Sequence, residues 1–307
     1  MMMNVEIYDI FHDECKEDGY WHSFIFIPRS TQQKFLSFLI EARENLNYFN
    51  PIHFTSVTKK SKPYSEKTQL IKSWTSILYY ALQEQKINAD LYLGNKDNRA
   101  VYKKIKGVEN KIGAKLVVLC EKDCLKKMFS SMSYSKKVEA TFRMGLKGGC
   151  HFLFKSIIKI GNIYVDHPEN KLNVNYDVNS ILQRLGLEFN NNISFNKDSQ
   201  IYAIDKRNYI PKDKISEFMQ LADISVGAIR TRALQIKEPI LRYEITYPLD
   251  DLFEKDLKNK ARMKNSRFLN SFSLSDAWIE DGSWKFDEMK IVKEDIQTHP
   301  SFWDNDR

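Results

Sequence analysis

The first residues of the chain alternate between apolar stretches and short polar segments. Residues 4–14 and 20–28 are rich in β-branched and aromatic side chains, and a polar KEDG segment separates them. Apolar runs that are punctuated in this way are typical of two strands joined as a hairpin. Residues 31–46 then place apolar side chains at helical spacing behind Thr31, which favours a capped helix. The pattern predicts an antiparallel strand pair followed by a helix.

Short strands and amphipathic helices continue to alternate through the middle of the chain. The pattern predicts a short strand at residues 51–57, a basic loop and then an aromatic-rich helix at residues 65–85. Further predicted strands cover residues 89–94, 115–120, 158–166 and 199–205, and further predicted helices cover residues 98–112, 136–157, 178–187 and 214–234. This interleaving indicates the α/β class and one domain of roughly 240 residues.

The pattern changes beyond Pro248. Residues 250–307 begin with a basic, helix-like arm and continue into an acidic tail that contains tryptophan. They hold 10 basic and 13 acidic residues, whereas the first 249 hold 37 basic and 27 acidic residues, a net charge of +10. Because the charge balance reverses where the alternation stops, we predict an α/β domain at residues 1–249. We expect residues 250–307 to form a C-terminal extension outside the sheet.

The composition is that of a globular protein, and its basic charge suggests a polyanionic partner; the alternative is a lysine-rich sequence that reflects genome composition. Of the 307 residues, 42% are apolar and 13% aromatic, which is enough for a full core. No basic start leads into an apolar run, and no stretch approaches roughly 18 apolar residues, so we expect a cytoplasmic protein without a membrane partner. The four cysteines are too few and too scattered for a disulfide framework. The net charge of +7 favours nucleic acid.

Three apolar elements each deliver an aspartate. Asp13 ends the first strand, Asp166 ends the strand at 158–166, and Asp223 lies in the apolar helix at 214–234. A buried carboxylate is costly unless it is paired or binds a cation. Carboxylates that converge from separate elements are the ligands that Mg²⁺ or Mn²⁺ requires. The alternative is a turn at Asp13, a loop at Asp166 and an ion pair between Asp223 and Arg230.

The helix at 214–234 also carries the most specific motif of the chain. Gln220-Leu221-Ala222-Asp223 precedes Gly227 and Ala228, and the first strand ends in Asp13-Glu14. With the "IHF" strand and the mid-chain strand that ends in Asp166, these features resemble the family called domain of unknown function 3800, over residues 5–234.

This resemblance implies a ribonuclease H-like fold, in which helices flank a mixed central sheet and an acidic site lies at the exposed end of that sheet. It implies that Asp13 is the shared metal ligand and that Asp166 and Asp223 supply the others. It also places the strand at 51–57 beside the first strand, so His53 is a candidate site residue. The alternative for His53 is a partly buried histidine bonded to the backbone.

The neighbours of these aspartates add weaker candidates. Adjacent side chains on a strand point to opposite faces, so Glu14 faces away from Asp13 unless the chain bends there. The same alternation sends His12 to the opposite face from Asp13. Asp205, at the end of a predicted strand, is the other candidate for a fourth metal ligand.

Two sets of basic residues are candidates for contacting phosphates, since Lys and Arg position a nucleic acid backbone without reading its sequence. They are Lys59, Lys60 and Lys62 in the basic loop, and Lys260, Arg262 and Lys264 in the C-terminal arm. The alternative in both places is a solvated basic surface.

We therefore predict a nuclease, or a related phosphoryl-transfer enzyme, that hydrolyses DNA or RNA with two divalent metal ions. Asp13→Asn and Asp223→Asn are expected to abolish cleavage and to keep or raise the melting temperature, since like carboxylates repel. One alternative is a ribonuclease H-like module that binds nucleic acid or a partner protein without catalysis. The resemblance alone suggests a bacterial defence system, such as phage defence, or a mobile element as its context. Another alternative is a hydrolase of a small phosphorylated molecule.

Overall fold

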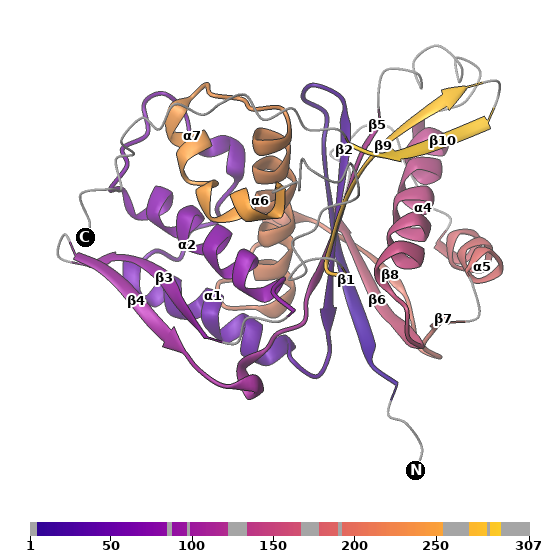
Figure 1. The fold of residues 1–307 in the computed structure, drawn as a ribbon, viewed down its shortest axis with the longest axis horizontal. Coiled ribbons are helices and arrows are strands. Elements are labelled where there is room, and N and C mark those ends of the chain that lie inside the picture. The colour runs from indigo at the N-terminus through magenta and orange to yellow at the C-terminus, as the bar shows by residue number, and fades with distance from the viewer. Residues whose placement is uncertain are drawn as a thin grey trace, which may run out of the picture. The chain divides into compact units, whose positions relative to one another are not determined.

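The computed structural model of the protein describes residues 5–84, 88–96, 99–121, 134–166, 178–189, 192–253, 270–280 and 283–289. Its elements fall into two compact units (Figure 1). The first unit comprises Met1–Gln33, Gly113–Tyr209 and Asn270–Met289, and the second comprises Lys34–Ile112, Ile210–Leu269 and Lys290–Arg307. The chain therefore enters each unit more than once.

The first unit is built on a mixed sheet, which has eight strands within the described residues. Its order is β10-β9-β5-β2-β1-β6-β7, and β8 also pairs with β6. The strands are β1 (Ile7–Cys15), β2 (Tyr20–Pro28), β5 (Lys115–Glu121), β6 (Ile158–Asp166), β7 (Ile193–Phe195), β8 (Ile201–Ile204), β9 (Phe272–Glu280) and β10 (Ser283–Glu288). β2 is antiparallel to β1 and β5, whereas β6 is parallel to β1, β7 and β8. The predicted N-terminal hairpin and α/β class are confirmed.

Two helices cover one face of this sheet (Figure 1). α4 (Tyr134–Leu153) and α5 (Val178–Glu188) close a core with the inward residues of β1, β2, β5 and β6. The glycines that interrupt the apolar pattern of α4 permit close contact: a Cβ on Gly149 would lie 2.3 Å from Val117. The central mixed sheet with flanking helices is therefore as predicted.

The second unit is mainly helical. It holds most of α1 (Gln32–Leu46), with α2 (Glu66–Ala81), α6 (Lys214–Ala233), α7 (Ile240–Glu244), the hairpin of β3 (Ala89–Lys96) and β4 (Arg99–Ile105), and the 3₁₀ turns η1 (Phe54–Ser56), η2 (Val108–Asn110) and η4 (Tyr247–Phe253). Ser65 caps the start of α2, because its side chain accepts a hydrogen bond from Thr68 N. Among the described helices, none is long and apolar enough to cross a bilayer.

Two predicted elements of the second unit are wrong. The stretch predicted as a helix at 98–112 contains strand β4, which is held by its pairing with β3, including the cross-strand pair of Tyr92 and Tyr102. The strand predicted at 51–57 is instead the 3₁₀ turn η1, closed by Ser56 N donating to His53 O. At β4 the hairpin pairing outweighs the helix-like pattern. At η1 the backbone of Ile52 and Phe54 bonds to side chains of α6 and not to a strand.

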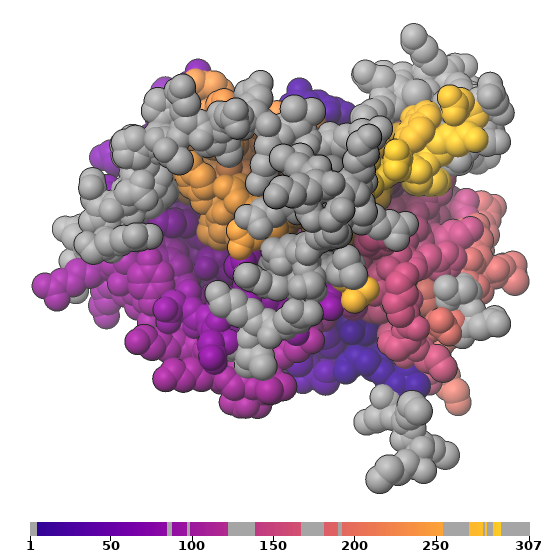
Figure 2. All heavy atoms as spheres, viewed as in Figure 1, coloured from indigo at the N-terminus to yellow at the C-terminus, as the bar shows by residue number. Residues whose placement is uncertain are grey.

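The expectation that residues 250–307 lie outside the sheet is also wrong for its described part. β9 pairs in parallel with β5, and β10 pairs with β9 at an edge of the sheet that reaches the surface in Figure 2. The prediction relied on the charge of the whole segment and overlooked a short run in which apolar and polar residues alternate. Phe272 and Leu274 of this run are buried. The boundary at residue 249 falls inside η4, and the basic arm lies outside the described residues.

Candidate functional site

The register of two parallel strands places Asp13 and Asp166 next to each other. His12 of β1 pairs with Val165 of β6, so these aspartates are the next residue on each strand. The Asp13 side chain is 2% exposed and that of Asp166 is 26% exposed. Both carboxylates therefore lie toward the carboxyl ends of neighbouring parallel strands, where open α/β sheets bind their ligands.

A lysine joins the two carboxylates. Lys206 Nζ lies 2.8 Å from Asp13 Oδ1 and 3.1 Å from Asp166 Oδ2. It begins the 3₁₀ turn η3 (Lys206–Asn208), directly beyond β8, whose Ile204 is in register with Asp166. Sequence reasoning missed this residue. The sequence signal for it was weak: Lys206 directly follows a predicted strand that ends at Asp205. Only the pairing of β8 with β6 shows that this strand end lies beside Asp166.

The arrangement fits a bound cation at one point. An ammonium nitrogen already lies between the two aspartates, so their oxygens converge on a single cation position. Carboxylate oxygens are the ligands that Mg²⁺ and Mn²⁺ prefer. In the part of the chain that the structure describes, no group of three or more His, Cys, Asp or Glu residues could hold a metal ion. The first unit therefore offers two carboxylate ligands and a resident ammonium group.

Glu14 and Asp205 have other contacts. The β1–β2 pairing continues to Cys15, so Glu14 points away from Asp13, and it accepts a hydrogen bond from Tyr20 Oη. Asp205 caps η3 by accepting from Arg207 N at 3.0 Å, and its other oxygen pairs with the Arg207 guanidinium at 2.7 Å. These contacts account for the position of Asp205 without a metal.

A buried histidine pair occupies the opposite face of β1. His12 Nε2 lies 2.9 Å from His22 Nδ1, and His22 Nε2 lies 2.9 Å from Thr141 Oγ1 on α4. Burial lowers the pKa of His12 well below its usual value and that of His22 to about 4. Both rings are therefore neutral at neutral pH. His12 faces away from Asp13, as the sequence predicted.

The motif on α6 holds the segment that contains His53. Ile52 N donates to Gln220 Oε1 at 2.6 Å, and Phe54 N donates to Asp223 Oδ2 at 2.8 Å. One turn further along α6, a Cβ on Gly227 would lie only 2.3 Å from the Phe54 ring. These three positions share a face of the helix because they are three and seven residues apart. The motif is therefore a clamp on residues 52–54.

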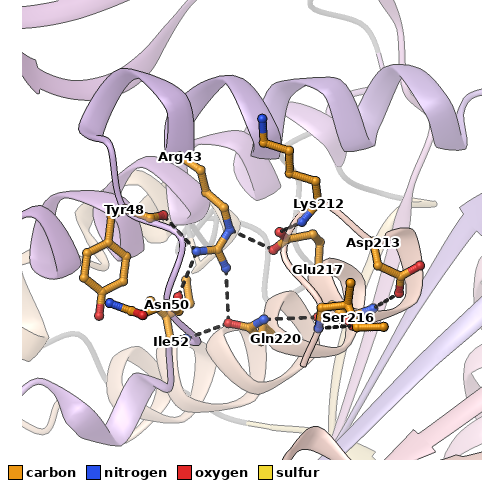
Figure 3. Close-up of polar contacts among 10 residues, drawn as sticks. Arg43, Tyr48, Asn50, Ile52, Lys212, Asp213, Ser216, Glu217 and Gln220 are labelled. Carbon is orange, nitrogen blue, oxygen red and sulfur yellow. Dashed lines mark hydrogen bonds and ion pairs between the residues drawn. The ribbon is translucent and has the colours of Figure 1, made fainter. Parts of the chain in front are cut away.

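A buried arginine orients one arm of this clamp (Figure 3). Arg43, which is fully buried, donates to Glu217 at 2.9 Å and to Gln220 Oε1 at 3.2 Å. Its remaining nitrogen donates to the carbonyl oxygens of Tyr48 and Asn50 at 3.2 and 3.0 Å. Because Gln220 Oε1 accepts from both Arg43 and Ile52 N, the amide has one favourable orientation.

His53 is displayed on the clamped turn. Its side chain is 45% exposed, and Nδ1 lies 3.9 Å from Asp223 Oδ1, a distance for an ion pair rather than a hydrogen bond. Arg242 donates to the carbonyl oxygens of Thr55 and Val57 and so holds the far side of the turn. The second unit thus presents a histidine and a carboxylate, Asp223, that is itself 19% exposed.

The predicted acidic residues are therefore distributed over both units. Asp13 and Asp166 come together in the first unit, whereas Asp223 and His53 come together in the second. The convergence of Asp223 with the other two stays a prediction.

The basic candidates are partly described. Lys59, Lys60 and Lys62 are exposed in the loop before α2, and Lys59 pairs with Glu238 at 3.0 Å. The other three, Lys260, Arg262 and Lys264, lie outside the described residues. The exposed loop is accessible to a phosphate backbone.

No protein-family model matches the sequence, and no curated protein matches it.

Proposed function

We propose that this protein is a divalent-metal-dependent nuclease that hydrolyses phosphodiester bonds of DNA or RNA. The observation that carries the proposal is the Asp13–Asp166 pair, whose oxygens converge on one cation position beside the carboxyl ends of β1 and β6. Two buried or half-buried carboxylates are costly to hold together without a cation. Because these carboxylates already bind the ammonium group of Lys206, the same oxygens are suited to bind a catalytic metal ion.

The order of the strands supports a ribonuclease H-like fold for this proposal. Such a sheet has three antiparallel strands followed by two parallel strands, with an acidic residue on the first strand. β5, β2 and β1 are antiparallel neighbours, β6 and β8 continue in parallel, and α4 connects β5 to β6. Asp13 is on β1, which occupies the central position of that series.

Each residue has a task in this proposal. Asp13 and Asp166 hold Mg²⁺ or Mn²⁺, which when bound activates water and stabilises the leaving oxygen. Asp13 is paired with Ser23 of β2 and directly follows the last β1–β6 pair, and its side chain is less exposed than that of Asp166, so it is the more rigid ligand. Asp223 anchors the turn at Phe54 N and orients His53, an exposed group able to accept or donate a proton. Exposed lysines of the loop before α2 attract the phosphate backbone.

A second function is favoured by Lys206. Its ammonium group already neutralises part of the Asp13–Asp166 charge, as in a permanent ion pair. In that case the protein would be a ribonuclease H-like module that binds nucleic acid or a partner protein without cutting. The net charge of +7 suits this function equally well.

A cleavage assay separates the two functions. Single- and double-stranded DNA and RNA are incubated with the protein and Mg²⁺ or Mn²⁺. We expect at least one substrate to be cleaved, and Asp13→Asn and Asp166→Asn to lose the activity by at least about a hundredfold. Asp198→Asn, at an exposed acid of the first unit, is the matched control. Intact substrates together with tight, salt-sensitive binding would assign the protein to the binding class.

A further inference from the structure

We propose that Lys206 is a resident counter-ion that a divalent metal must displace, and that the displaced ammonium then pairs with a phosphate of the substrate. The inference rests on the proposed function and concerns how its site is regulated. It begins from the position of Lys206 Nζ, which is within ion-pair distance of both Asp13 and Asp166.

The first step is the charge balance of the site. The two carboxylates carry two negative charges and Lys206 carries one positive charge, so the three groups together have a net charge of −1. The site therefore still attracts a cation, but less than the bare carboxylate pair would. With Asp13 at 2% and Lys206 at 15% exposure, little water screens these charges.

The second step is competition for the same oxygens. Lys206 contacts Oδ1 of Asp13 and Oδ2 of Asp166, the oxygens that face the common cation position. A metal ion bound to both would have to lie between them, where the ammonium nitrogen is. Only one of the two cations can take that place, so metal affinity must include the cost of moving Lys206.

The third step is that Lys206 is able to move without its backbone. The chain before it is held by the pairing of β8 with β6, and the chain after it by the Asp205 cap on η3. The lysine stem itself is flexible and its ammonium has no fixed geometry, unlike the planar fork of arginine. Withdrawal therefore needs only new side-chain rotamers.

The consequence is coupling between metal and substrate. After it withdraws, the Lys206 ammonium group stays close to the two aspartates. A substrate phosphate that binds the metal would then form an ion pair with this ammonium group. Phosphate then holds the lysine away and raises metal affinity, and by linkage metal raises phosphate affinity by the same factor. Metal alone therefore binds against the competing lysine, and metal and substrate together withdraw the lysine more completely than either does alone.

The test is a calorimetric titration of the full chain with Mn²⁺, in the absence of nucleic acid. Lys206→Met removes the competing charge and keeps the length of the side chain, so we expect it to bind Mn²⁺ about tenfold more tightly than wild type. Lys206→Arg keeps the charge and adds a rigid fork, so it should bind more weakly than wild type. Lys197→Met removes the same charge at an exposed position of the first unit and should match wild type.

A second readout is the melting temperature. Without metal, Lys206→Met should melt lower than wild type, and saturating Mn²⁺ should raise its melting temperature by more. If Lys206→Met fails to fold, weaker Mn²⁺ binding by Lys206→Arg still supports the inference, and unchanged binding overturns it.

The outcomes also separate this inference from the proposed function. If wild type binds Mn²⁺ and Lys206→Met binds it no more tightly, the inference is overturned while the metal-dependent function stands. If neither protein binds Mn²⁺, the proposed function fails as well, and Lys206 is a permanent structural partner of the two aspartates.

Discussion

In the first unit, Asp13 Oδ1 pairs with the side chain of Lys206, and His12 Nε2 pairs with the side chain of His22. In the second unit, Gln220 and Asp223 instead accept the backbone N–H groups of residues 52 and 54. A side-chain partner can change its rotamer without altering the path of the chain. A backbone partner is part of the chain path. The polar residues of the second unit therefore fix the chain path at residues 52–54, whereas those of the first unit contact groups that can move.

The largest expected effect is the acid sensitivity of the histidine pair in the first unit. His22 titrates near 6.5 when unfolded, but burial lowers its native pKa to about 4. The unfolded chain therefore binds more protons, so stability falls as the pH falls below about 6.5, by roughly 3 kcal/mol once the pH is below 4. Urea denaturation from pH 7.5 to 4 measures this slope.

His22→Gln keeps polar atoms in the same place and should reduce the slope. His151 of α4 is less buried and burial also lowers its pKa, so His151→Gln should reduce the slope by less. An unchanged slope in His22→Gln would show that other groups drive the acid response.

The next effect is at Asp13, where the structure changes the expectation from sequence. Repulsion between carboxylates alone predicted that Asp13→Asn keeps or raises the melting temperature. Because Asp13 is paired with Lys206, we now expect the substitution to cost about 2 kcal/mol at neutral pH without metal. Thermal melts of Asp13→Asn and the control Asp198→Asn measure it. A melting temperature at or above wild type would mean that Lys206 does not stabilise the pair.

The smallest effect is at Asp223. Asn keeps a side-chain oxygen that accepts from Phe54 N, so Asp223→Asn should cost less than about 1 kcal/mol. Asp223→Ala removes the acceptor and should cost about 1 to 2 kcal/mol. The same denaturation measurements apply. Equal costs for the two variants would show that the charge of Asp223, and not its hydrogen bond with Phe54 N, stabilises the second unit.

The sequence predicted local features well and tertiary partners poorly. The N-terminal hairpin, the helix that begins near Ser65 and the strand that ends at Asp166 follow from periodicity and punctuation. β4 was missed because the helix-like pattern of its residues does not report their hairpin pairing with β3, and β9 because charge counts do not report strand pairing. Asp13 and Asp166 were identified as carboxylates on apolar elements. Lys206 was not, since only the β6–β8 pairing brings it to them.

The most direct test of the Asp13–Asp166 metal site is a crystal structure of the protein grown with Mn²⁺, with anomalous scattering used to locate the ion. We predict one peak about 2 Å from oxygens of both Asp13 and Asp166, with Lys206 Nζ withdrawn from them. A map at saturating Mn²⁺ in which Lys206 still bridges the aspartates and no peak lies beside them would contradict it.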